Sequence, residues 1–465
     1  RALSPDPAPE TAAGGQLPGI AAAVAPPMRA YRVAPGGTLS GEVRVPGDKS
    51  ISHRAIMLGA LADGDTAITG FLEGADSLAT LAAFRSMGVA IEGPEAGRVF
   101  IRGVGRDGLQ APSVPLDVGN AGTAMRLLCG LLSGQPFAST LVGDASLSRR
   151  PMRRVTEPLA RMGADIETAE AGTAPLAIRP APRLQGIDYA MPVASAQVKS
   201  CLLLAGLYAD GDTCVSEPAV TRDHTERMLA TFGCPVRRDG HRVCIHGGAR
   251  LNAAPVEVPA DISSAAFFLV GASIADGADL ILPAVGINPT RVGVLNILEA
   301  MGADVAVTNP RQCGAEPVAD LRVRSARLRG IEIPSDQVPL AIDEFPALFI
   351  AAACADGETM LTGAEELRVK ESDRIAVMAA GLAQLGVEAE VLRDGIRIRG
   401  RGAASLGGGS VDSHGDHRIA MAFAMAALRA SAPILVRDCA NVDTSFPGFA
   451  ALAAGAGLGI EEAVE

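Results

Sequence analysis

The chain is 465 residues long, with 48% hydrophobic residues, 20% charged residues and a formal net charge of −11. A chain of this length and composition is globular and usually divides into two or more domains. The negative charge argues against nucleic acid or an anionic membrane as a partner, because both bind broad basic faces, and no uncharged apolar run reaches the roughly 18 residues that a membrane span needs.

Residues 1–29 differ from the rest of the chain. They are rich in Ala, Pro and Gly and show no apolar periodicity, which predicts a disordered leader. The segment lacks both the continuous apolar stretch of a signal peptide and the arginine density of a transit peptide.

From residue 30 onward, one pattern of helices and strands recurs. A helix, a glycine and a strand follow one another in MGVAI, MGADI, FGCPV, MGADV, LGVEA and LGIEE, with the glycines at positions 88, 163, 233, 302, 386 and 459. Each glycine is expected to cap the helix before it. Almost wholly apolar helices precede a second recurring phrase, as in GALADGDTAITG and AAACADGETMLT, and a helix that is apolar all round must be buried.

The six repeats therefore each predict one buried and one surface helix flanking strands. Three repeats can pack their buried helices together and place their sheets outside. We predict an α/β fold of two domains with three repeats each, divided near residue 256.

The eight cysteines form no CxxC pair and lie mostly in apolar patterns. We interpret them as reduced, buried, small hydrophobic residues, which fits a cytoplasmic protein.

The loops that lead into the buried helices are the most polar segments of the chain. They are GDKSISHR at 47–54, GNAGTAMR at 119–126, ASAQVKS at 194–200, ADISS at 260–264, IDEF at 342–345 and HGDHR at 414–418. A helix N-terminus exposes unpaired N–H groups and a partial positive charge, so it favours anions. Capping alone explains ADISS, but it does not require the lysine, glutamine and arginine of the GDKS, ASAQ and DHR segments.

The loops that enter the surface helices supply arginines. They are SLSRRPMRR at 146–154, VTRDHTER at 220–227, NPTR at 288–291 and LRVKESDR at 367–374. Arginine binds phosphate and carboxylate bidentately, so several such loops together would hold a multiply anionic small molecule. Arg150, Arg222, Arg374 and Arg418 lie in these loops or at a helix start, although any single one could be a solvated surface charge.

Several other site types are not supported. GDKS lacks the spacing of a phosphate-binding P-loop, His414 and His417 have no third metal ligand near them, and neither a GxSxG elbow nor a reactive-cysteine motif occurs. Two pairs could perform proton chemistry: Asp343 with Glu344 at the start of a buried helix, and Lys370 with the adjacent Glu371.

Lysine is unusually rare, because it occurs only as Lys49, Lys199 and Lys370 among 41 lysines and arginines. All three lie in dense polar motifs, PGDKSISHR, SAQVKS and RVKESDR. Lysine provides a compact, mobile charge that arginine cannot replace in kind. We expect these positions to mark special roles.

The motifs PGDKSISHR, GNAGTAMR, SAQVKS, TRDHTERM, RVKESDR and DHRIAM together resemble the 5-enolpyruvylshikimate-3-phosphate synthase family, over residue 30 to the end. The SAQVKS motif, together with Thr444, favours the second bacterial class of this family. The resemblance implies two domains of three βαβαββ units, with buried helices inside and sheets outside. It places 30–47 with 257–465 in one discontinuous domain, 48–256 in the other, and the active site in the cleft between them.

The family transfers the enolpyruvyl group of phosphoenolpyruvate to the 5-hydroxyl of shikimate 3-phosphate and releases phosphate, in the shikimate pathway to chorismate and the aromatic amino acids. The resemblance implies no metal and no organic cofactor. It also implies a cytoplasmic monomer that glyphosate inhibits, with room for that inhibitor beside Gly122. Neither nucleic acid nor a membrane is expected as a partner.

The resemblance assigns roles to individual residues. Asp343 is expected to be the base for the 5-hydroxyl, Glu371 the acid for the methylene carbon, and Lys49 a third catalytic group. The residues expected at shikimate 3-phosphate are Lys49, Ser50, Arg54, Ser195, Ala196, Gln197, Arg222, Asp343 and Lys370. Those expected at phosphoenolpyruvate are Lys49, Gly122, Arg150, Gln197, Arg374 and Arg418.

Lys199 lies two residues after Gln197, where a helix turns its side chain away, so we expect a structural or supporting role for it. One position departs from the family pattern: Thr444 stands where many members have a lysine before Ser/Thr-Phe-Pro. Two alternatives stay open, a UDP-N-acetylglucosamine enolpyruvyl transferase and a non-catalytic protein that binds a phosphorylated metabolite.

Overall fold

The computed structural model describes residues 29–464, so the predicted leader lies outside the described residues except for its last member. Arg29 begins strand β1 (Arg29–Val33), and placing it in the leader was wrong. Its backbone pairs with Val464 near the other end of the chain, and its guanidinium forms an ion pair with Glu462.

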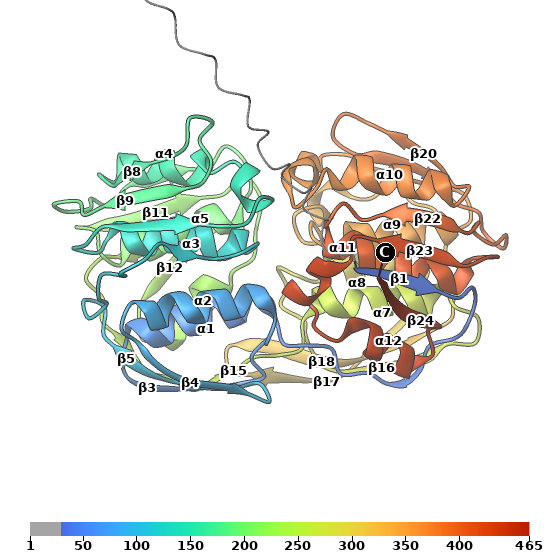
Figure 1. Cartoon of the computed structure of the whole chain (residues 1–465), viewed down its shortest axis with the longest axis horizontal. Helices are drawn as coiled ribbons and strands as arrows, with labels where there is room; N and C mark the ends of the chain where they lie inside the picture. The colour runs from blue at the N-terminus through green and yellow to red at the C-terminus, as the bar shows by residue number, and fades with distance from the viewer. Residues whose placement is uncertain (1–28, 465) are drawn as a thin grey trace, which may run out of the picture.

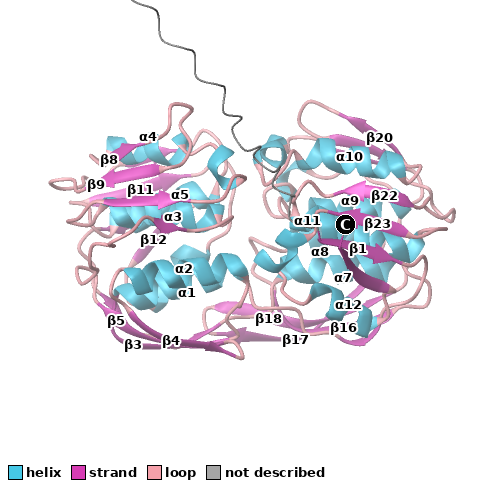
Figure 2. Cartoon of the chain, viewed as in Figure 1, coloured by secondary structure: helices cyan, strands magenta, loops and turns pink. Residues whose placement is uncertain are grey.

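The chain folds into two lobes, each with three inner helices, three outer helices and sheets around them (Figure 1; Figure 2). The first lobe contains α1 (Lys49–Leu61), β3 (Ala62–Thr69), α2 (Ala75–Ser86), β4 (Ala90–Glu95), β5 (Arg98–Val104), β6 (Leu116–Asp117), α3 (Gly122–Ser133), β7 (Ser139–Val142), α4 (Arg153–Arg161), β8 (Asp165–Glu167), β9 (Leu176–Arg179), β10 (Asp188–Ala190), α5 (Ala196–Gly206), β11 (Asp212–Ser216), α6 (His224–Thr231), β12 (Val236–Asp239), β13 (Arg242–His246), β14 (Leu251–Asn252) and β15 (Val256–Glu257).

The second lobe contains both ends of the described chain. Its elements are β1, β2 (Ser40–Glu42), α7 (Ile262–Ile274), β16 (Asp279–Gly286), α8 (Gly293–Ala300), β17 (Asp304–Cys313), β18 (Glu316–Arg324), α9 (Phe345–Cys354), β19 (Glu358–Leu361), α10 (Arg374–Gln384), β20 (Glu388–Val391), β21 (Ile396–Arg399), β22 (Gly409–Asp412), α11 (His417–Ala426), β23 (Ile434–Arg437), α12 (Phe449–Ala456) and β24 (Ile460–Val464).

Each repeat contributes one small sheet. The orders in the first lobe are β14-β3-β5-β4 with β15 also on β3, β6-β7-β9-β8, and β10-β11-β13-β12. Those in the second lobe are β17-β18-β16-β2, β19-β21-β20, and β22-β23-β1-β24. The predicted α/β fold, with buried helices inside and sheets outside, is confirmed.

The inner helices α1, α3 and α5 pack in the first lobe, and α7, α9 and α11 pack in the second. All 13 residues of α7 are buried, as the almost wholly apolar sequence predicts. The core of the first lobe is drawn from Ile51 to Val258, and that of the second from Tyr31–Val45 and Ala260–Ile460. The domain limits at 47/48 and 256/257 stay a prediction.

Two short connections join the lobes and pair with each other. Asp48 N donates to Pro259 O at 2.8 Å, and Asp261 N donates to Pro46 O at 2.9 Å. Gly47 is required at this crossing, because a Cβ there would lie 1.9 Å from the carbonyl oxygen of Gly70.

The predicted helix caps hold in five repeats. Gly88, Gly163, Gly233, Gly302 and Gly386 all have positive φ angles. The sixth prediction was wrong, because α12 ends at Ala456 and its left-handed cap is Gly457, with φ 117°, rather than Gly459.

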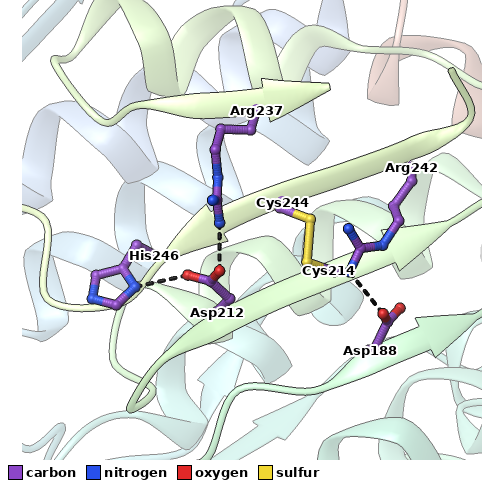
Figure 3. Close-up of a disulfide and its surroundings, with 7 residues drawn as sticks. All are labelled: Asp188, Asp212, Cys214, Arg237, Arg242, Cys244 and His246. Atoms are coloured by element: carbon purple, nitrogen blue, oxygen red, sulfur yellow. Dashed lines mark hydrogen bonds and ion pairs between the residues drawn. A yellow bond between two sulfur atoms is a disulfide. The ribbon is translucent and has the colours of Figure 1, made fainter. Parts of the chain in front are cut away.

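The prediction that all eight cysteines are reduced was wrong for two of them. Cys214 on β11 and Cys244 on β13 form a disulfide, with their Cα atoms 4.1 Å apart (Figure 3). Antiparallel pairing places the two residues directly opposite each other, which the sequence spacing of 30 residues did not reveal. The other six cysteines are free and buried, as predicted.

None of the helices within residues 29–464 is long and apolar enough to cross a membrane.

Candidate active site

All six inner helices begin at one cavity between the lobes. Residues at their caps, in their first turns or just before them line it: Lys49, Ser50, Gly122, Thr123, Ala196, Gln197, Asp261, Ser263, Asp343 and Arg418. Their N-termini add unpaired N–H groups and partial positive charge, so the fold itself favours an anion here.

The lining is also rich in cations. It contains Lys49, Arg54, Arg126, Arg150, Arg222, Arg291, Lys370 and Arg418, against the carboxylates Asp76, Asp261, Asp343, Glu366 and Glu371. Eight cations less five carboxylates leave a formal charge of +3 in a chain whose total is −11. Such a cavity concentrates positive potential and is suited to a multiply anionic ligand.

A second cavity adjoins the first and shares Ala196, Gln197, Arg222, Asp343, Glu366 and Lys370 with it. The further lining includes Ser195 and Thr221 and an apolar wall of Val193, Val338, Pro339 and Ile342. Asp343 lies where the two cavities meet.

Asp343 is held by cations from both lobes. Its carboxylate lies 2.7 Å from Arg222 Nη2, 3.4 Å from Lys370 Nζ and 3.5 Å from Arg374 Nη1. Burial acts to raise the pKa of this carboxyl, but Arg222, Lys370 and the arginines around them outweigh it and hold the pKa well below its ordinary value. Asp343 is therefore an ionised acceptor at neutral pH.

Glu371 lies on the other side of the same guanidinium. Arg374 Nη2 donates to Glu371 Oε2 at 2.7 Å, and Arg150 Nη1 lies 3.6 Å from the other carboxylate oxygen. Burial acts to raise the pKa of Glu371. Arg374 and Arg150 outweigh this effect and hold the pKa well below its ordinary value. Arg374 itself is buried and is fixed by Asp416 at 2.9 Å.

Lys49 lies at the contact between the lobes. Its Nζ is 2.9 Å from Asp76 Oδ2 and 2.6 Å from Ser445 Oγ, which in turn lies 3.1 Å from His417 Nε2. Burial raises the pKa of Asp76, although Lys49 opposes this. Burial also keeps the pKa of His417 well below its ordinary value, so its imidazole is neutral.

Several side chains of the cavity lining have a buried polar atom that forms no hydrogen bond. Among the residues that the structure describes, Arg150 Nε and Asp76 Oδ1 are buried and find no hydrogen-bond partner. Arg150 is oriented by Asn120, whose Oδ1 accepts from Nη2 at 2.6 Å. Gly122 lies directly beside it, since a Cβ on this glycine would be 2.9 Å from Arg150 Nη1.

Gln197 and Arg54 are tied to other protein groups. Arg126 Nη1 donates to Gln197 Oε1 at 2.5 Å. The Arg54 guanidinium donates to Thr225 Oγ1, to Ser50 O and to Ser200 Oγ at 2.7, 2.8 and 2.8 Å. Burial lowers the pKa of Arg54 to about 10, so it keeps its charge at neutral pH, and two of its five N–H donors remain.

The structure brings the sequence-predicted residues together. Twelve of them line the first cavity: Lys49, Ser50, Arg54, Gly122, Arg150, Ala196, Gln197, Arg222, Asp343, Lys370, Glu371 and Arg418. Ser195 lines the adjoining cavity, and Arg374 lies behind Asp343 and Glu371 rather than in the lining. Thr444 is absent from both linings, and the next residue, Ser445, contacts Lys49 instead.

Sequence reasoning missed several lining residues. Asp261 was interpreted as a cap only, yet it caps α7 and also lies 3.2 Å from Arg291. Arg126 and Arg291 are the last residues of the segments GNAGTAMR and NPTR, but no role was predicted for them. Asp76 has no local signal, because it reaches the cavity only through the packing of α2 against the second lobe.

Lys199 lies outside both linings, as expected from its place on α5. It is fully buried and forms ion pairs with Glu217 and Glu226 at 3.1 and 2.8 Å. This placement agrees with the expected structural or supporting cation, and the role itself stays a prediction.

Comparisons with known proteins show close relatives of the chain. The chain is 69% identical to the 3-phosphoshikimate 1-carboxyvinyltransferase of Alkalilimnicola ehrlichii, over 92% of this chain and 96% of that protein. It is 67% identical to the enzyme of the same name from Methylococcus capsulatus, over 93% and 98% of the two chains.

Solved structures show the same likeness. The EPSP synthase of Acinetobacter baumannii superposes with a TM-score of 0.84 at 56% identity, over 94% of this chain and all of that one. The enolpyruvyl transferase NikO of Streptomyces tendae, at 17% identity and a TM-score of 0.77, shares the fold over 95% of this chain. The model of EPSP synthase (3-phosphoshikimate 1-carboxyvinyltransferase) matches residues 33–452, and the chain therefore belongs to this family.

Proposed function

We propose that the cavity between the lobes binds phosphoenolpyruvate and shikimate 3-phosphate side by side, and that Asp343 and Glu371 move the protons of the enolpyruvyl transfer. The reaction is that of the family to which the chain belongs. The observation that carries the residue assignment is Arg374, whose guanidinium lies 3.5 Å from Asp343 on one side and 2.7 Å from Glu371 on the other. The Arg374 guanidinium therefore lies between the proposed base, Asp343, and the proposed acid, Glu371.

Phosphoenolpyruvate is assigned to the cations around Glu371. Lys49, Arg150 and Arg418 line the cavity and Arg374 lies behind Glu371, with Gly122 and Gln197 at helix starts. The unpaired Arg150 Nε is a donor that a phosphate or carboxylate oxygen would satisfy. Planar guanidinium groups hold both anionic ends of this small substrate in a fixed orientation, which supplies proximity and charge stabilisation.

Shikimate 3-phosphate is assigned to the adjoining cavity and its border. Ser195, Ala196, Gln197 and Arg222 would bind the phosphate and ring, together with Lys49, Ser50, Arg54 and Lys370. The start of α5 offers its free N–H groups to the phosphate. This pose directs the 5-hydroxyl at Asp343, which lies where the two cavities meet.

The proton chemistry follows from the two carboxyls. Glu371 protonates the methylene carbon of phosphoenolpyruvate, and the adjacent carbon becomes cationic. The 5-hydroxyl adds to that carbon while Asp343 takes its proton, which gives a tetrahedral intermediate. Glu371 then takes a proton back from the new methyl group as the carbon–oxygen bond to phosphate breaks. The departing phosphate takes up the proton held by Asp343, which leaves the enol ether and free phosphate.

Glu371 must carry a proton to begin this sequence, although its neighbours hold its pKa well below the ordinary value. Arg374 and Arg150 cause that depression. When the phosphate and carboxylate of phosphoenolpyruvate pair with these arginines, their effect on Glu371 is neutralised and burial then favours the protonated acid. Donor binding thus prepares its own acid catalyst.

Neither alternative function gains support from a specific observation. Among the described residues, no cysteine lines either cavity, and the relatives named above carry the name of the shikimate enzyme. Asp343, Glu371 and Lys49, whose loss would indicate a binding protein, all face the first cavity.

The remaining assignments are a cytoplasmic monomer and inhibition by glyphosate. Both walls of the cavity come from one chain, which supports a monomer. The anionic substrates do not cross membranes unaided, which supports a cytoplasmic location. Gly122 lines the cavity beside Arg150, which supports glyphosate binding there, and unchanged turnover at millimolar glyphosate would contradict it.

The test is phosphate release from phosphoenolpyruvate, measured with shikimate 3-phosphate, with UDP-N-acetylglucosamine and with neither. Release only with shikimate 3-phosphate is expected. Release with the nucleotide sugar, or with no acceptor dependence, would overturn the proposal. Light scattering after gel filtration tests the monomer.

A further inference from the structure

The loop between β11 and α6 carries Arg222, and its conformation depends on a buried ion-pair network. Thr221, the residue before Arg222, is held at both polar groups of its backbone. Its N–H donates to Glu217 Oε2 at 3.2 Å, and its carbonyl oxygen accepts from Lys199 Nζ at 3.3 Å. The Thr221 hydroxyl also donates to Glu217 Oε2, at 2.6 Å.

The groups that hold Thr221 are themselves paired and shielded from water. Lys199 Nζ lies 3.1 Å from Glu217 Oε2 and 2.8 Å from Glu226 Oε1, and the side chains of Lys199 and Glu217 are fully buried. Arg238, which is partly exposed, lies 3.6 Å from Glu217 and 3.3 Å from Glu226. Two cations therefore face two carboxylates beneath the loop.

A fully buried ion pair is weak evidence that its residues stabilise the folded protein. The desolvation of two charges offsets most of their attraction, and apolar residues of similar volume often stabilise a protein equally well. Buried polar networks whose groups are hydrogen-bonded instead fix one conformation, and in this network Glu226 Oε2 is the described side-chain atom that lacks a hydrogen-bond partner. Here the fixed element is the peptide next to Arg222, a residue whose side chain spans the gap to Asp343 of the other lobe.

We propose that Lys199 is a positioning residue, which acts through Glu217 and Thr221 to hold Arg222 in place for the phosphate of shikimate 3-phosphate. Lys199 touches neither cavity and no reacting atom. The inference deepens the proposed function and depends on the assignment of Arg222 to that phosphate. It also gives a reason for a lysine here, because a compact ammonium serves three acceptors that lie in different directions.

The test uses Lys199→Met, which keeps the length of the side chain and removes its charge. The folded protein retains Arg238 as a cation for both glutamates. The expected result is a KM for shikimate 3-phosphate raised about tenfold, with kcat and the KM for phosphoenolpyruvate within about threefold of the parent. Calorimetric titration with shikimate 3-phosphate should show the same loss of affinity without turnover.

A control separates positioning from general destabilisation. Val243→Ala removes buried side-chain volume on β13, which pairs with β11, the strand that leads into the loop with Arg222. It should lower the thermal midpoint while leaving both KM values unchanged. Equal changes in the kinetics of Lys199→Met and Val243→Ala would overturn the proposal.

A double-mutant cycle separates this inference from the proposed function. Arg222→Gln alone should raise the KM for shikimate 3-phosphate, and an unchanged KM would show that the assignment of Arg222 is wrong. If Lys199 acts through Arg222, Lys199→Met should have no further effect on that KM in the Arg222→Gln background. Additive effects of the two substitutions would overturn the positioning role while leaving the proposed function intact.

Discussion

Arg222 Nη2 lies 2.7 Å from Asp343 Oδ2, and the two residues belong to different lobes. The arginine assigned to a substrate phosphate is thus paired with the carboxylate assigned as the base. A phosphate that binds Arg222 competes with this ion pair and leaves Asp343 free to accept the proton of the hydroxyl. Binding of shikimate 3-phosphate would therefore release the carboxylate of Asp343 to act as the base.

Replacement of Asp343 by asparagine should remove the base while keeping the size of the side chain. We expect kcat to fall by about 10²–10⁴-fold, the usual contribution of a positioned proton acceptor. Shikimate 3-phosphate should still bind, because Arg222 gains freedom when the carboxylate charge is lost. Steady-state kinetics and calorimetric titration test both statements. The matched control is Asp336→Asn, an exposed acid seven residues earlier in the chain, and a similar loss there would contradict a specific role for Asp343.

Gly122→Ala should weaken binding of phosphoenolpyruvate. The new Cβ would lie 2.9 Å from Arg150 Nη1 and 3.4 Å from Arg126 Nη1, so the Arg150 guanidinium has to move. We expect the KM for phosphoenolpyruvate to rise about tenfold or more, while the KM for shikimate 3-phosphate stays within about twofold. Inhibition by glyphosate should weaken in parallel if it occupies the same space.

The control for that substitution is Gly455→Ala in α12, where a Cβ has no heavy atom within 4 Å. Its kinetics should match those of the parent protein. A selective rise in the KM for shikimate 3-phosphate in Gly122→Ala would place the donor substrate elsewhere.

The fold and much of the site could be predicted from the sequence because both depend on local patterns that repeat. The apolar helices and their glycine caps are visible in the sequence, as are the polar loops at helix starts. Contacts between distant segments were not visible. Asp76 reaches the cavity, and Cys214 meets Cys244, only through packing of helices and strand register. Gly457 replaced Gly459 as a cap because both positions offer glycine and only the helix length decides between them.

The three lysines should respond differently to replacement by arginine. Lys49 and Lys370 have side chains that are 16% and 19% exposed and face the first cavity. Arginine at either position cannot reproduce the position of the ammonium group, and turnover should fall more than 100-fold, an effect on the order of that from misplacing a catalytic group. The fold should be retained at both positions, as judged by the thermal midpoint.

Lys199→Arg should show the opposite pattern. The larger guanidinium must enter a site where the lysine side chain has no exposed surface, so the thermal midpoint should fall. The charge and the hydrogen-bond donors remain, so kcat should stay within about threefold of the parent. Equal losses of turnover at all three lysines would show that this division of roles is wrong.

Acidification should destabilise the protein through a buried histidine. Burial, with help from Lys49 and Arg54, lowers the pKa of His53 to about 3. The unfolded chain takes up this proton below about pH 6.5, whereas the folded protein does not, so stability is lost as the pH falls from 6.5 toward 3. The loss is about 1.4 kcal/mol per pH unit for this one buried histidine, or about 2 kcal/mol between pH 6.5 and 5.

Thermal midpoints between pH 7.5 and 5 test this dependence. His53→Gln removes the titrating group and should make the decline shallower than in the parent protein. The control is His246→Gln on β13, where the histidine side chain is 73% exposed and stays in contact with water. That variant should keep the slope of the parent. Parallel declines for the parent and His53→Gln would contradict a neutral buried imidazole at position 53.

The Cys214–Cys244 disulfide should be visible as a difference in the number of titratable thiols. The unfolded chain should react at six thiols before reduction and at eight afterwards, since six cysteines are free in the folded protein. The crosslink closes a loop between residues 30 apart, so reduction should lower the free energy of unfolding by about 3–4 kcal/mol in the chain-entropy estimate. The double variant Cys214→Ser with Cys244→Ser serves as its own control, because a reductant should not shift its thermal midpoint. Eight reactive thiols before reduction would show that the two strands pair without the covalent bond.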